Sequence, residues 1–483
     1  MRILALVLLN LTLWILPVQA QLWSGIIDSK RAIDWSVSAG IPGGVPKRTV
    51  VCTTLNPGAT AAQINSAISA CGTNQVVFLN AGTYSLTSSI QFNRNDVVLR
   101  GAGANQTLLQ FSGGSGCGNT SCTVLFSQNG QWSGGPQFTA TFLGAGNPPV
   151  SGTYTKGATQ ILVSSNANMA VGQTLILDQL DDAVDTGNVY ICGTTAATCS
   201  SEGQAAGGGR GGNHALMQFA EITGINGTVI TIRQPLYMPT WRTSQSPDVW
   251  WTSSPEKNAG IENLTVDARN ASIGATVLFE NAHGCWMKGV RSLKSTGARA
   301  HIEQQYSSGI VVRDSYLFGT AGTNLSYGVE TWMSGNALIE NNIIEQGVAG
   351  FLMGAGAGSV FAYNYIVDQV STNNGWLFPG TMEHDPGTVM NLYEGNDTYS
   401  MMQDAIHGSH AMATFFRNRS RGFDDTQTAQ TVPLLISSFS RYGNIIGNIL
   451  GRSGYHNKYQ SNSNGTSSNC DTSIYNMGWG STE

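Results

Sequence analysis

The sequence predicts a parallel β-helix, a solenoid in which every coil of the chain adds strands to long parallel sheets. An apolar strand that ends on an amide, a carboxylate or Gly returns six times, at 310–314, 337–344, 360–367, 391–396, 414–418 and 445–450. If Asp314, Asn341, Asn364, Gly395, Asn418 and Asn448 are equivalent, successive copies lie 27, 23, 31, 23 and 30 residues apart. Repeats of this length with alternating apolar residues are typical of stacked, strand-rich coils.

The composition agrees with a turn-rich stacked architecture. Charged residues make up 11% of the chain, Gly is abundant with 59 residues and Pro is sparse with 14, whereas an ordinary globular domain has roughly a quarter of its residues charged. Amides at the repeat step can form hydrogen-bonded ladders between coils about 4.8 Å apart. The net charge of −5 and the absence of a visible basic patch argue against a nucleic-acid partner.

The first twenty residues have the pattern of a secretory signal peptide. Met1-Arg2 is followed by an apolar core at 3–9 and a small-residue exit ending at Ala20. A membrane anchor is the alternative, but Asn10 and Thr12 interrupt a stretch that is already short. We expect cleavage after Ala20 and a secreted protein, extracellular or periplasmic, that is monomeric and has no membrane contact after cleavage.

Eight cysteines are consistent with an oxidising compartment. Three local pairings are plausible disulfides: Cys52 with Cys71, Cys117 with Cys122, and Cys192 with Cys199. Cys285 lies within a strand-like run and is expected to be a buried thiol, and Cys470 has no obvious partner. None of the cysteines has the spacing of a structural zinc site.

The first coils are expected to begin behind a short helix. Residues 60–70 place Ile64, Ala67, Ile68 and Cys71 on one stripe, and a helix there would cover the open first coil. Strands are expected next, at 76–79, 82–86, 97–103 and 107–111.

This opening resembles the start of pectate-lyase-superfamily (pectin-lyase-like) domains. The similar features are the helix, the Phe-Leu-x-x-Gly-x-Tyr segment at 78–84 and the Val-x-Leu-x-Gly-x-Gly segment at 97–103. The resemblance covers about residues 50–111 and, through the repeats, 256–479. It implies a right-handed parallel β-helix and an extracellular polysaccharide as substrate.

A different pattern separates these two stretches. Short strands with Gly turns predict a small inserted β-barrel-like module at 137–238, between the cap and first coils (21–136) and the main β-helix (239–483). Its Gly-rich loop at 181–214 suggests a flap. Asp181, Asp182 and Asp185 in this loop could hold Ca²⁺, although a solvated acidic turn is the competing interpretation. After residues 474–477 no capping element follows, so either loops cover the last coil or the reading frame is incomplete.

Counting back from the repeat positions predicts a catalytic column. The residue twelve positions before each marker is apolar in most of the repeats and should point inward. The residue that follows it should therefore point outward. These outward residues are Glu303, Glu330, Met353, His384, His407 and Ser437. Stacked carboxylates can divide into an acid and a base, and histidines titrate near neutral pH. We therefore predict Glu303, Glu330, His384 and His407 to be catalytic, with no resident metal assigned.

This column depends on the register chosen. Taking Asn396 instead of Gly395 as the marker replaces His384 by Asp385. A solvated polar ladder without a catalytic role is the alternative interpretation.

Six further residues are assigned to substrate binding: Trp332, Tyr306, His410, Arg417, Arg419 and Asp404. Exposed rings can stack on sugars, and an Arg can neutralise a uronate carboxylate. Core packing of the rings and surface salt bridges of the arginines are the alternatives.

Three functions remain open. A polysaccharide lyase is slightly favoured, because Arg and His gather at 384–421 while Lys is scarce. A glycoside hydrolase could use the Glu303/Glu330 pair, and a non-catalytic glycan-binding or cell-surface protein needs neither. The Asn-Thr-Asp, Gly-His-Gly and Arg-Ile-Lys triplets typical of polygalacturonases are absent, which disfavours pectin as the substrate.

Overall fold

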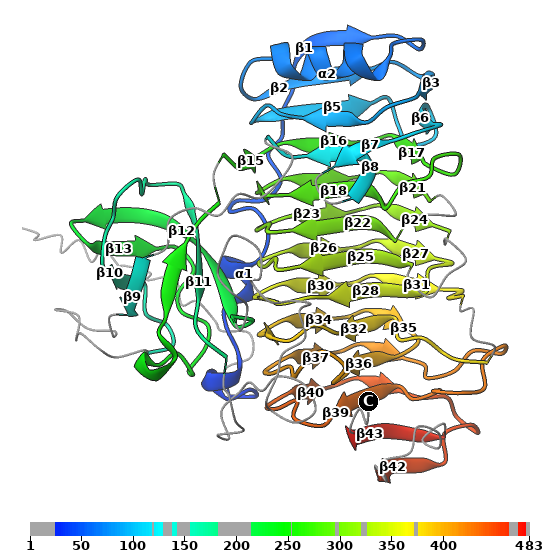
Figure 1. The fold of residues 1–483 in the computed structure, drawn as a ribbon. Helices are drawn as coiled ribbons and strands as arrows, with labels where there is room; N and C mark the ends of the chain where they lie inside the picture. The colour runs from blue at the N-terminus through cyan, green and yellow to red at the C-terminus, as the bar shows by residue number, and fades with distance from the viewer. Residues whose placement is uncertain are drawn as a thin grey trace, which may run out of the picture.

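The computed structural model confirms the parallel β-helix: the coils stack along one axis and form three long parallel sheets (Figure 1). It describes residues 25–117, 120–128, 138–142, 155–181, 214–252, 254–294, 299–319, 326–370, 375–462 and 472–479. The predicted signal peptide lies outside these residues. None of the helices in the described part is long and apolar enough to cross a membrane.

We name the three sheets A, B and C in the order in which each coil visits them. Sheet A contains β1 (Val50–Leu55), β2 (Gln75–Leu79), β5 (Val97–Gly101), β16 (Gly260–Glu262), β20 (Trp286–Lys288), β23 (Val311–Arg313), β26 (Leu338–Glu340), β30 (Val360–Ala362), β34 (Leu392–Glu394), β37 (Thr414–Phe416) and β40 (Asn444–Ile446). Sheet B contains β3 (Gly82–Leu86), β6 (Thr107–Phe111), β17 (Thr265–Asp267), β21 (Arg291–Leu293), β24 (Tyr316–Phe318), β27 (Ile343–Glu345), β31 (Tyr365–Val367), β35 (Asp397–Thr398), β38 (Arg419–Ser420) and β41 (Ile449–Leu450).

Sheet C is the longest. It contains β4 (Ile90–Phe92), β8 (Thr120–Phe126), β18 (Ala275–Glu280), β22 (Ala300–Gln305), β25 (Tyr327–Trp332), β28 (Ala349–Met353), β32 (Thr381–Glu383), β36 (Met401–Gln403), β39 (Leu434–Ser437), β43 (Ser473–Trp479) and β42 (Lys458–Asn462), with β7 (Ser115–Cys117) pairing antiparallel to β8. Inward side chains of the three sheets form one continuous apolar core, in which rings stack from coil to coil, as Phe361 does on Tyr393.

An asparagine ladder runs through the core at the turn between sheets A and B. Its members are Asn342, Asn364, Asn396, Asn418 and Asn448, and each donates its Nδ2 to the Oδ1 of the next at 3.0 Å. The expected inward ladder is therefore present. Three of the sequence markers are wrong by one residue. Asp314, Asn341 and Gly395 lie at the preceding corner with φ of 55°, 54° and 63°, and the inward positions belong to Ser315, Asn342 and Asn396.

A helix covers the first coil, as expected. α2 (Ala61–Ala70) begins with a capping box between Thr60 and Gln63, and its Ile64 and Ile68 are fully buried against the core. The disulfide between Cys52 and Cys71 joins the end of this helix to β1.

The other cysteine predictions divide into tested and untested ones. Cys117 and Cys122 form a disulfide and Cys285 is a buried free thiol. Cys192, Cys199 and Cys470 lie outside the described residues.

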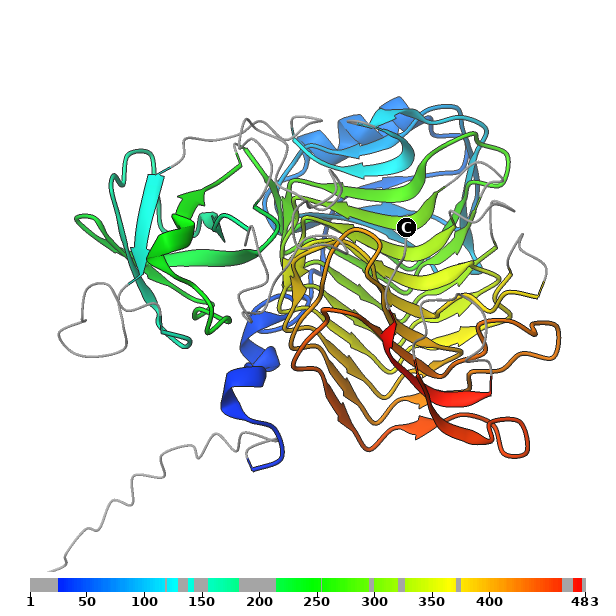
Figure 2. The ribbon, with the colours of Figure 1, turned by 60° about the horizontal axis from the view of Figure 1, so that its bottom comes forward.

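The inserted module is a closed antiparallel barrel that stands beside the β-helix (Figure 2). Its strands are β9 (Phe138–Phe142), β10 (Gln160–Val163), β11 (Thr174–Asp178), β12 (Met217–Asn226), β13 (Val229–Ile232) and β14 (Asp248–Trp250). The last strand lies beyond residue 238, the end expected for the module. Most of the Gly-rich loop at 181–214 lies outside the described residues.

Several short elements lie outside the three long sheets and the barrel. They are η1 (Ser29–Arg31), α1 (Trp35–Ser38), η3 (Thr243–Gln245), and the paired strands β15 (Glu256–Lys257) with β19 (Ala282–His283) and β29 (Gly356–Ala357) with β33 (Thr388–Val389). Trp35 donates its indole N–H to the carbonyl of Met390 at 2.8 Å. Asn336 in turn binds Phe219 and Tyr237 of the barrel segment.

Candidate functional site

The predicted outward column is wrong below the second glutamate. Glu303 and Glu330 are aligned on neighbouring strands of sheet C, as expected. The outward positions that follow are occupied by Leu352, Met382, Met402 and Leu435, not by Met353, His384, His407 and Ser437. The coil of Leu352 lies between the coils of Glu330 and His384, so the glutamates and the histidines do not form one continuous column.

Marker position and turn length explain this error. Asp314 and Asn341 precede the inward ladder position by one residue, whereas Asn364 occupies it, so the count from Asn364 reaches Met353 instead of Leu352. Asn342 and Asn364 follow the inward residues Thr331 and Met353 by 11 positions, so the turns between sheets C and A are equally long in these coils. In the next two coils Asn396 follows Glu383 by 13 positions and Asn418 follows Gln403 by 15. The additional residues lie in the turns that carry His384 and His407.

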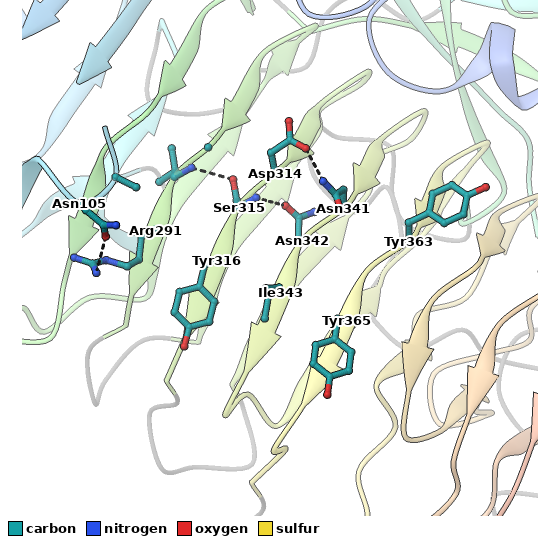
Figure 3. Close-up of a pocket in the computed structure, with 13 residues that line it drawn as sticks. Asn105, Arg291, Asp314, Ser315, Tyr316, Asn341, Asn342, Ile343, Tyr363 and Tyr365 are labelled. Carbon is teal, nitrogen blue, oxygen red and sulfur yellow. Dashed lines mark hydrogen bonds between the residues drawn. The ribbon is translucent and has the colours of Figure 1, made fainter. Parts of the chain in front are cut away.

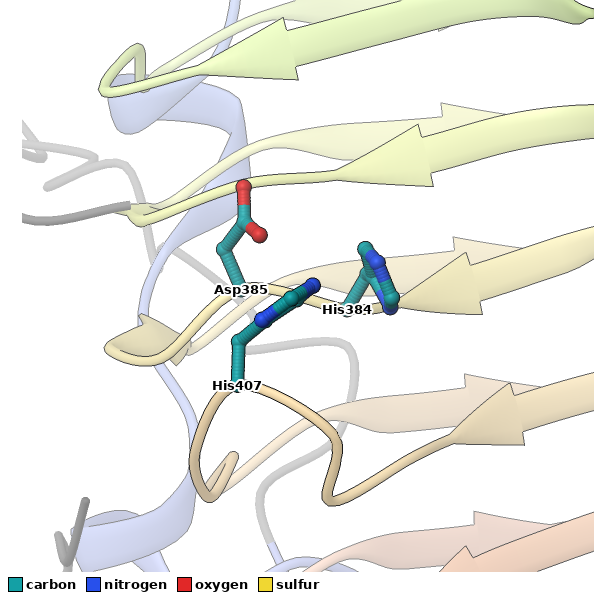
Figure 4. Close-up of side chains that lie close together, drawn as sticks. All are labelled: His384, Asp385 and His407. Carbon is teal, nitrogen blue, oxygen red and sulfur yellow. The ribbon is translucent and has the colours of Figure 1, made fainter. Parts of the chain in front are cut away.

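These two longer turns bring five titratable side chains together, which we call the histidine cluster: His384, Asp385, Asp404, His407 and His410. His384 and Asp385 directly follow β32, and Asp404 directly follows β36 one coil below. The rings of His384 and His407 lie edge to face with centroids 4.4 Å apart. Figure 4 shows His384, Asp385 and His407 gathered at the ends of these two coils.

Asp404 orients His384. Its Oδ2 lies 2.5 Å from Nδ1 of His384, and its Oδ1 lies 3.9 Å from Nε2 of the fully buried His410. Burial alone would raise the pKa of Asp404, but the two histidines lower it to about 2. Because an ionised carboxylate only accepts hydrogen bonds, we assign the proton of the neutral His384 ring to Nδ1, which makes Nε2 the basic nitrogen.

Glu383 supports the cluster from inside the coil. It is fully buried, accepts hydrogen bonds from Tyr393 at 3.0 Å and from Gln403 at 2.6 Å, and burial raises its pKa. Gln403 belongs to the strand that precedes Asp404, so Glu383 fixes the two neighbouring coils to each other at this point.

A second group on the outer face of sheet C, which we call the glutamate cluster, consists of Glu280, Glu303 and Glu330. Arg299 binds both carboxylate oxygens of Glu330, at 2.5 to 3.0 Å. Burial, and then the charge of Glu330, raise the pKa of Glu303 to about 7, and burial raises that of Glu280 to about 7 as well. All three side chains are buried, and Gln305 donates to Glu303 at 2.5 Å.

The two predicted aromatic platforms pack against the barrel. The rings of Tyr306 and Trp332 meet edge to face at 5.4 Å and lie in an apolar cluster with Trp250 and Met217 of the barrel. Trp332 is half-buried and Tyr306 is buried. The two rings therefore lie between the barrel and sheet C.

The predicted arginines lie at a different corner of the solenoid. Arg417 forms an ion pair with Glu394, and Arg419 binds Asp397 at 3.2 Å, both at the turns between sheets A and B. The histidine cluster lies at the turns between sheets C and A, so the structure does not bring these arginines to it.

The prediction missed three contributors. Asp385 entered it only as the outcome of a different register, Glu280 lies in the coil before the first marker, and Arg299 precedes its strand. No repeat position marks Glu280 or Arg299. A strand-like segment at 275–280 that ends on a carboxylate is the signal that could have revealed Glu280.

A surface hollow of about 460 Å³ lies on sheet B, away from both clusters (Figure 3). Tyr316, Ile343 and Tyr365 are aligned along it on three successive strands, and Tyr363 stands beside them at the corner. Tyr363 and Tyr365 are strongly exposed, at 55% and 42%. The polar lining of the hollow includes Asp314. Burial would raise the pKa of Asp314, but the hydrogen bonds from Asn341 and Arg313 outweigh the burial and lower this pKa.

Metal-binding geometry occurs in the histidine cluster. Among the described residues, one group of three or more His, Cys, Asp or Glu side chains has ligand atoms mutually close: His384, Asp385 and His407, within 4.8 Å of one another. Asp181, one of the three aspartates that could hold Ca²⁺, accepts a hydrogen bond from the backbone of Ala215 at 2.9 Å, and Asp182 and Asp185 lie outside the described residues.

Comparison with known proteins does not identify an activity. No family model and no curated protein matches the sequence. Among solved structures, the tailspike gp61 of Pseudomonas phage phi297 is similar, with a TM-score of 0.49 and 12% identity over 86% of this chain and 73% of that one. The A-module of the Azotobacter vinelandii mannuronan C-5 epimerase AlgE6 matches with a TM-score of 0.39 and 12% identity over 86% and 90%.

A Yersinia enterocolitica family 28 exopolygalacturonase matches with a TM-score of 0.32 and 10% identity over 84% of this chain and 76% of that one. At these identities the likeness concerns the fold alone. The three parallel sheets of this chain define a parallel β-helix.

Proposed function

We propose that this chain is a secreted enzyme that cleaves an extracellular, uronate-containing polysaccharide by β-elimination at the histidine cluster. The observation that carries the proposal is the His384–Asp404 pair, in which a buried carboxylate holds Nδ1 of a half-buried imidazole at 2.5 Å. A carboxylate that fixes the tautomer of a histidine is a standard way to prepare a general base.

In this reaction Nε2 of His384 removes the C5 proton beside the uronate carboxylate. The electron pair of the C–H bond forms the C4–C5 double bond, the C4–O bond breaks, and the departing oxygen takes up a proton. His407, whose ring lies 4.4 Å from that of His384, can donate this proton in its imidazolium form. General acid–base catalysis of this kind contributes roughly 10²–10⁴-fold to a rate.

Hydrolysis at the glutamate cluster is the second candidate. The raised pKa of Glu303, about 7, next to the carboxylate of Glu330 is the pattern of a glycosidase acid and its partner. However, Arg299 holds both oxygens of Glu330, which lowers its ability to attack a sugar carbon. At the histidine cluster, by contrast, Asp404 binds Nδ1 of His384 and leaves Nε2 as the basic nitrogen, so we prefer elimination.

Binding without catalysis is the third candidate. The exposed rings of Tyr363 and Tyr365 at the hollow on sheet B favour it, because tyrosine rings in open, partly polar hollows can stack on sugar rings. Such a site can also serve an enzyme as a substrate anchor.

Two sets of variants separate these functions. The mature protein and its His384→Gln variant are incubated with acidic polysaccharides, and the appearance of unsaturated uronate ends is followed. His456→Gln is the matched control, because His456 is a partly buried histidine bound to Thr431 in another part of the chain. We expect loss of product with His384→Gln only. Loss with Glu303→Gln/Glu330→Gln instead, and products of hydrolytic mass, would transfer the function to the glutamate cluster.

A further inference from the structure

The histidine cluster has the composition of a transition-metal site. His384, Asp385 and His407 present ligand atoms that all lie within 4.8 Å of one another (Figure 4). In a zinc site with bonds of about 2.0–2.2 Å, ligand atoms stand roughly 3.5 Å apart, so small side-chain rotations suffice to close this group around one ion.

The donor set selects the class of cation. Two imidazoles and one carboxylate suit Zn²⁺, Cu²⁺, Ni²⁺ or Fe²⁺, whereas Ca²⁺ and Mg²⁺ require sites made almost entirely of oxygen ligands. Three protein ligands also leave a coordination position for water or a substrate oxygen.

The surroundings orient the ligands as an outer shell does in metal sites. Asp404 holds Nδ1 of His384, which leaves Nε2 as the coordinating atom, and such carboxylate–histidine pairs raise ligand basicity. The backbone amides of His384 and Asp385 both donate to the carbonyl of Met353 on the coil above, at 3.0 and 3.2 Å. Two ligands are thus fixed by the solenoid itself, and His407 is presented from the longer turn below.

We propose that His384, Asp385 and His407 bind one divalent transition-metal ion, and that the bound ion inhibits β-elimination. The inhibition rests on the proposed function, since Nε2 of His384 cannot coordinate a metal and remove a proton at the same time. The binding itself does not depend on it.

Titration of the mature protein with Zn²⁺ alone tests the site. We expect one Zn²⁺ per chain, at least tenfold weaker binding by His407→Ala, and roughly 10–100-fold weaker binding by Asp404→Asn through loss of the outer shell. His456→Ala should bind as the wild type, and Ca²⁺ should not compete. Binding of Co²⁺, followed by its visible absorption, reports the ligand geometry independently.

Two results would overturn the site: no stoichiometric Zn²⁺ binding by the folded wild type, or unchanged binding by His407→Ala. His407→Gln replaces His407→Ala if circular dichroism shows that the alanine variant is unfolded. The activity arm is separate. Zn²⁺ should abolish product formation and a chelator restore it. Stoichiometric binding with undiminished turnover would overturn the inhibition alone, and binding by a protein without any lyase activity would contradict the proposed function while leaving the metal site intact.

Discussion

The Nδ1 atom of His384 lies 2.5 Å from Oδ2 of Asp404, a residue 20 positions later that occupies the next coil of the solenoid. The parallel pairing of β32 with β36 sets this distance. Glu383 is aligned with Gln403 at the ends of the two strands, and His384 and Asp404 are the next residues. The pair therefore depends on coil stacking, not on a flexible loop. Burial, opposed by the charges of His384 and His410, leaves the pKa of Asp404 at about 2, so the carboxylate is ionised at any pH at which the protein would work.

Asp404→Asn should remove most of the activity without unfolding the protein. An amide can present its NH₂ to Nδ1 and stabilise the wrong tautomer, so we expect kcat to fall about 10³-fold or more, with KM changed only a few-fold. Steady-state kinetics on the preferred polysaccharide measure both constants. A proportional rise in KM at constant kcat would show that Asp404 acts only in substrate binding.

Glu330→Gln should affect stability more than elimination. It leaves the guanidinium of Arg299, whose side chain is 46% exposed, without its charged partner, so we expect a loss of about 1–2 kcal/mol in unfolding free energy. Urea unfolding measures this loss. The elimination rate should stay within about threefold of the wild type, and a loss of more than 100-fold in a folded variant would favour the hydrolase.

The pH dependence of stability should reflect Glu303. Its pKa is raised from 4.5 in the unfolded chain to about 7 in the folded protein, chiefly by burial and then by Glu330. The folded state therefore holds the proton more tightly, and this stabilisation is complete below pH 4.5 and lost as the pH rises to about 7. We expect the Tm to fall between pH 5 and pH 8, and to fall less in Glu303→Gln. An identical pH profile of the two proteins would show that Glu303 titrates normally.

The asparagine ladder should contribute strongly to stability. Asn396→Ala removes the donor to the carbonyl of Phe361 and the acceptor of the Asn364 amide, both in the core, so we expect a loss of about 3 kcal/mol. Asn56→Ala is the matched control, because Asn56 is exposed and accepts one bond from Asn80. We expect it to cost less than about 0.5 kcal/mol. Equal losses, measured by chemical unfolding, would mean that the ladder adds nothing beyond a surface amide.

The repeats were sufficient to predict the coil, the inward amides and the capping helix, because these follow from alternation and from the uncovered end of a solenoid. They could not fix the register at the corners. At 341–342 and 395–396 two adjacent residues both suit a turn, and only the backbone shows that the first takes the left-handed conformation and the second points inward. The neighbouring Glu303 and Glu330 were aligned correctly because the turns in their coils have equal length.

The histidine cluster shows why the rest of the site was missed. Its members lie in turns that are longer by two and four residues, and a fixed repeat cannot place residues that it does not contain. Asp404 and His407 come close to His384 only when the coils are stacked. Insertions at one corner of successive coils are therefore the sequence signal to look for in this fold.

The measurement that tests the central claim most directly is mass spectrometry of the products formed by the mature protein and by Asp404→Asn from acidic polysaccharides. Elimination at His384 predicts fragments that are one water lighter than hydrolysis products, and their loss in the variant. Fragments of full hydrolytic mass, or light fragments that persist in Asp404→Asn at the wild-type rate, would contradict the account.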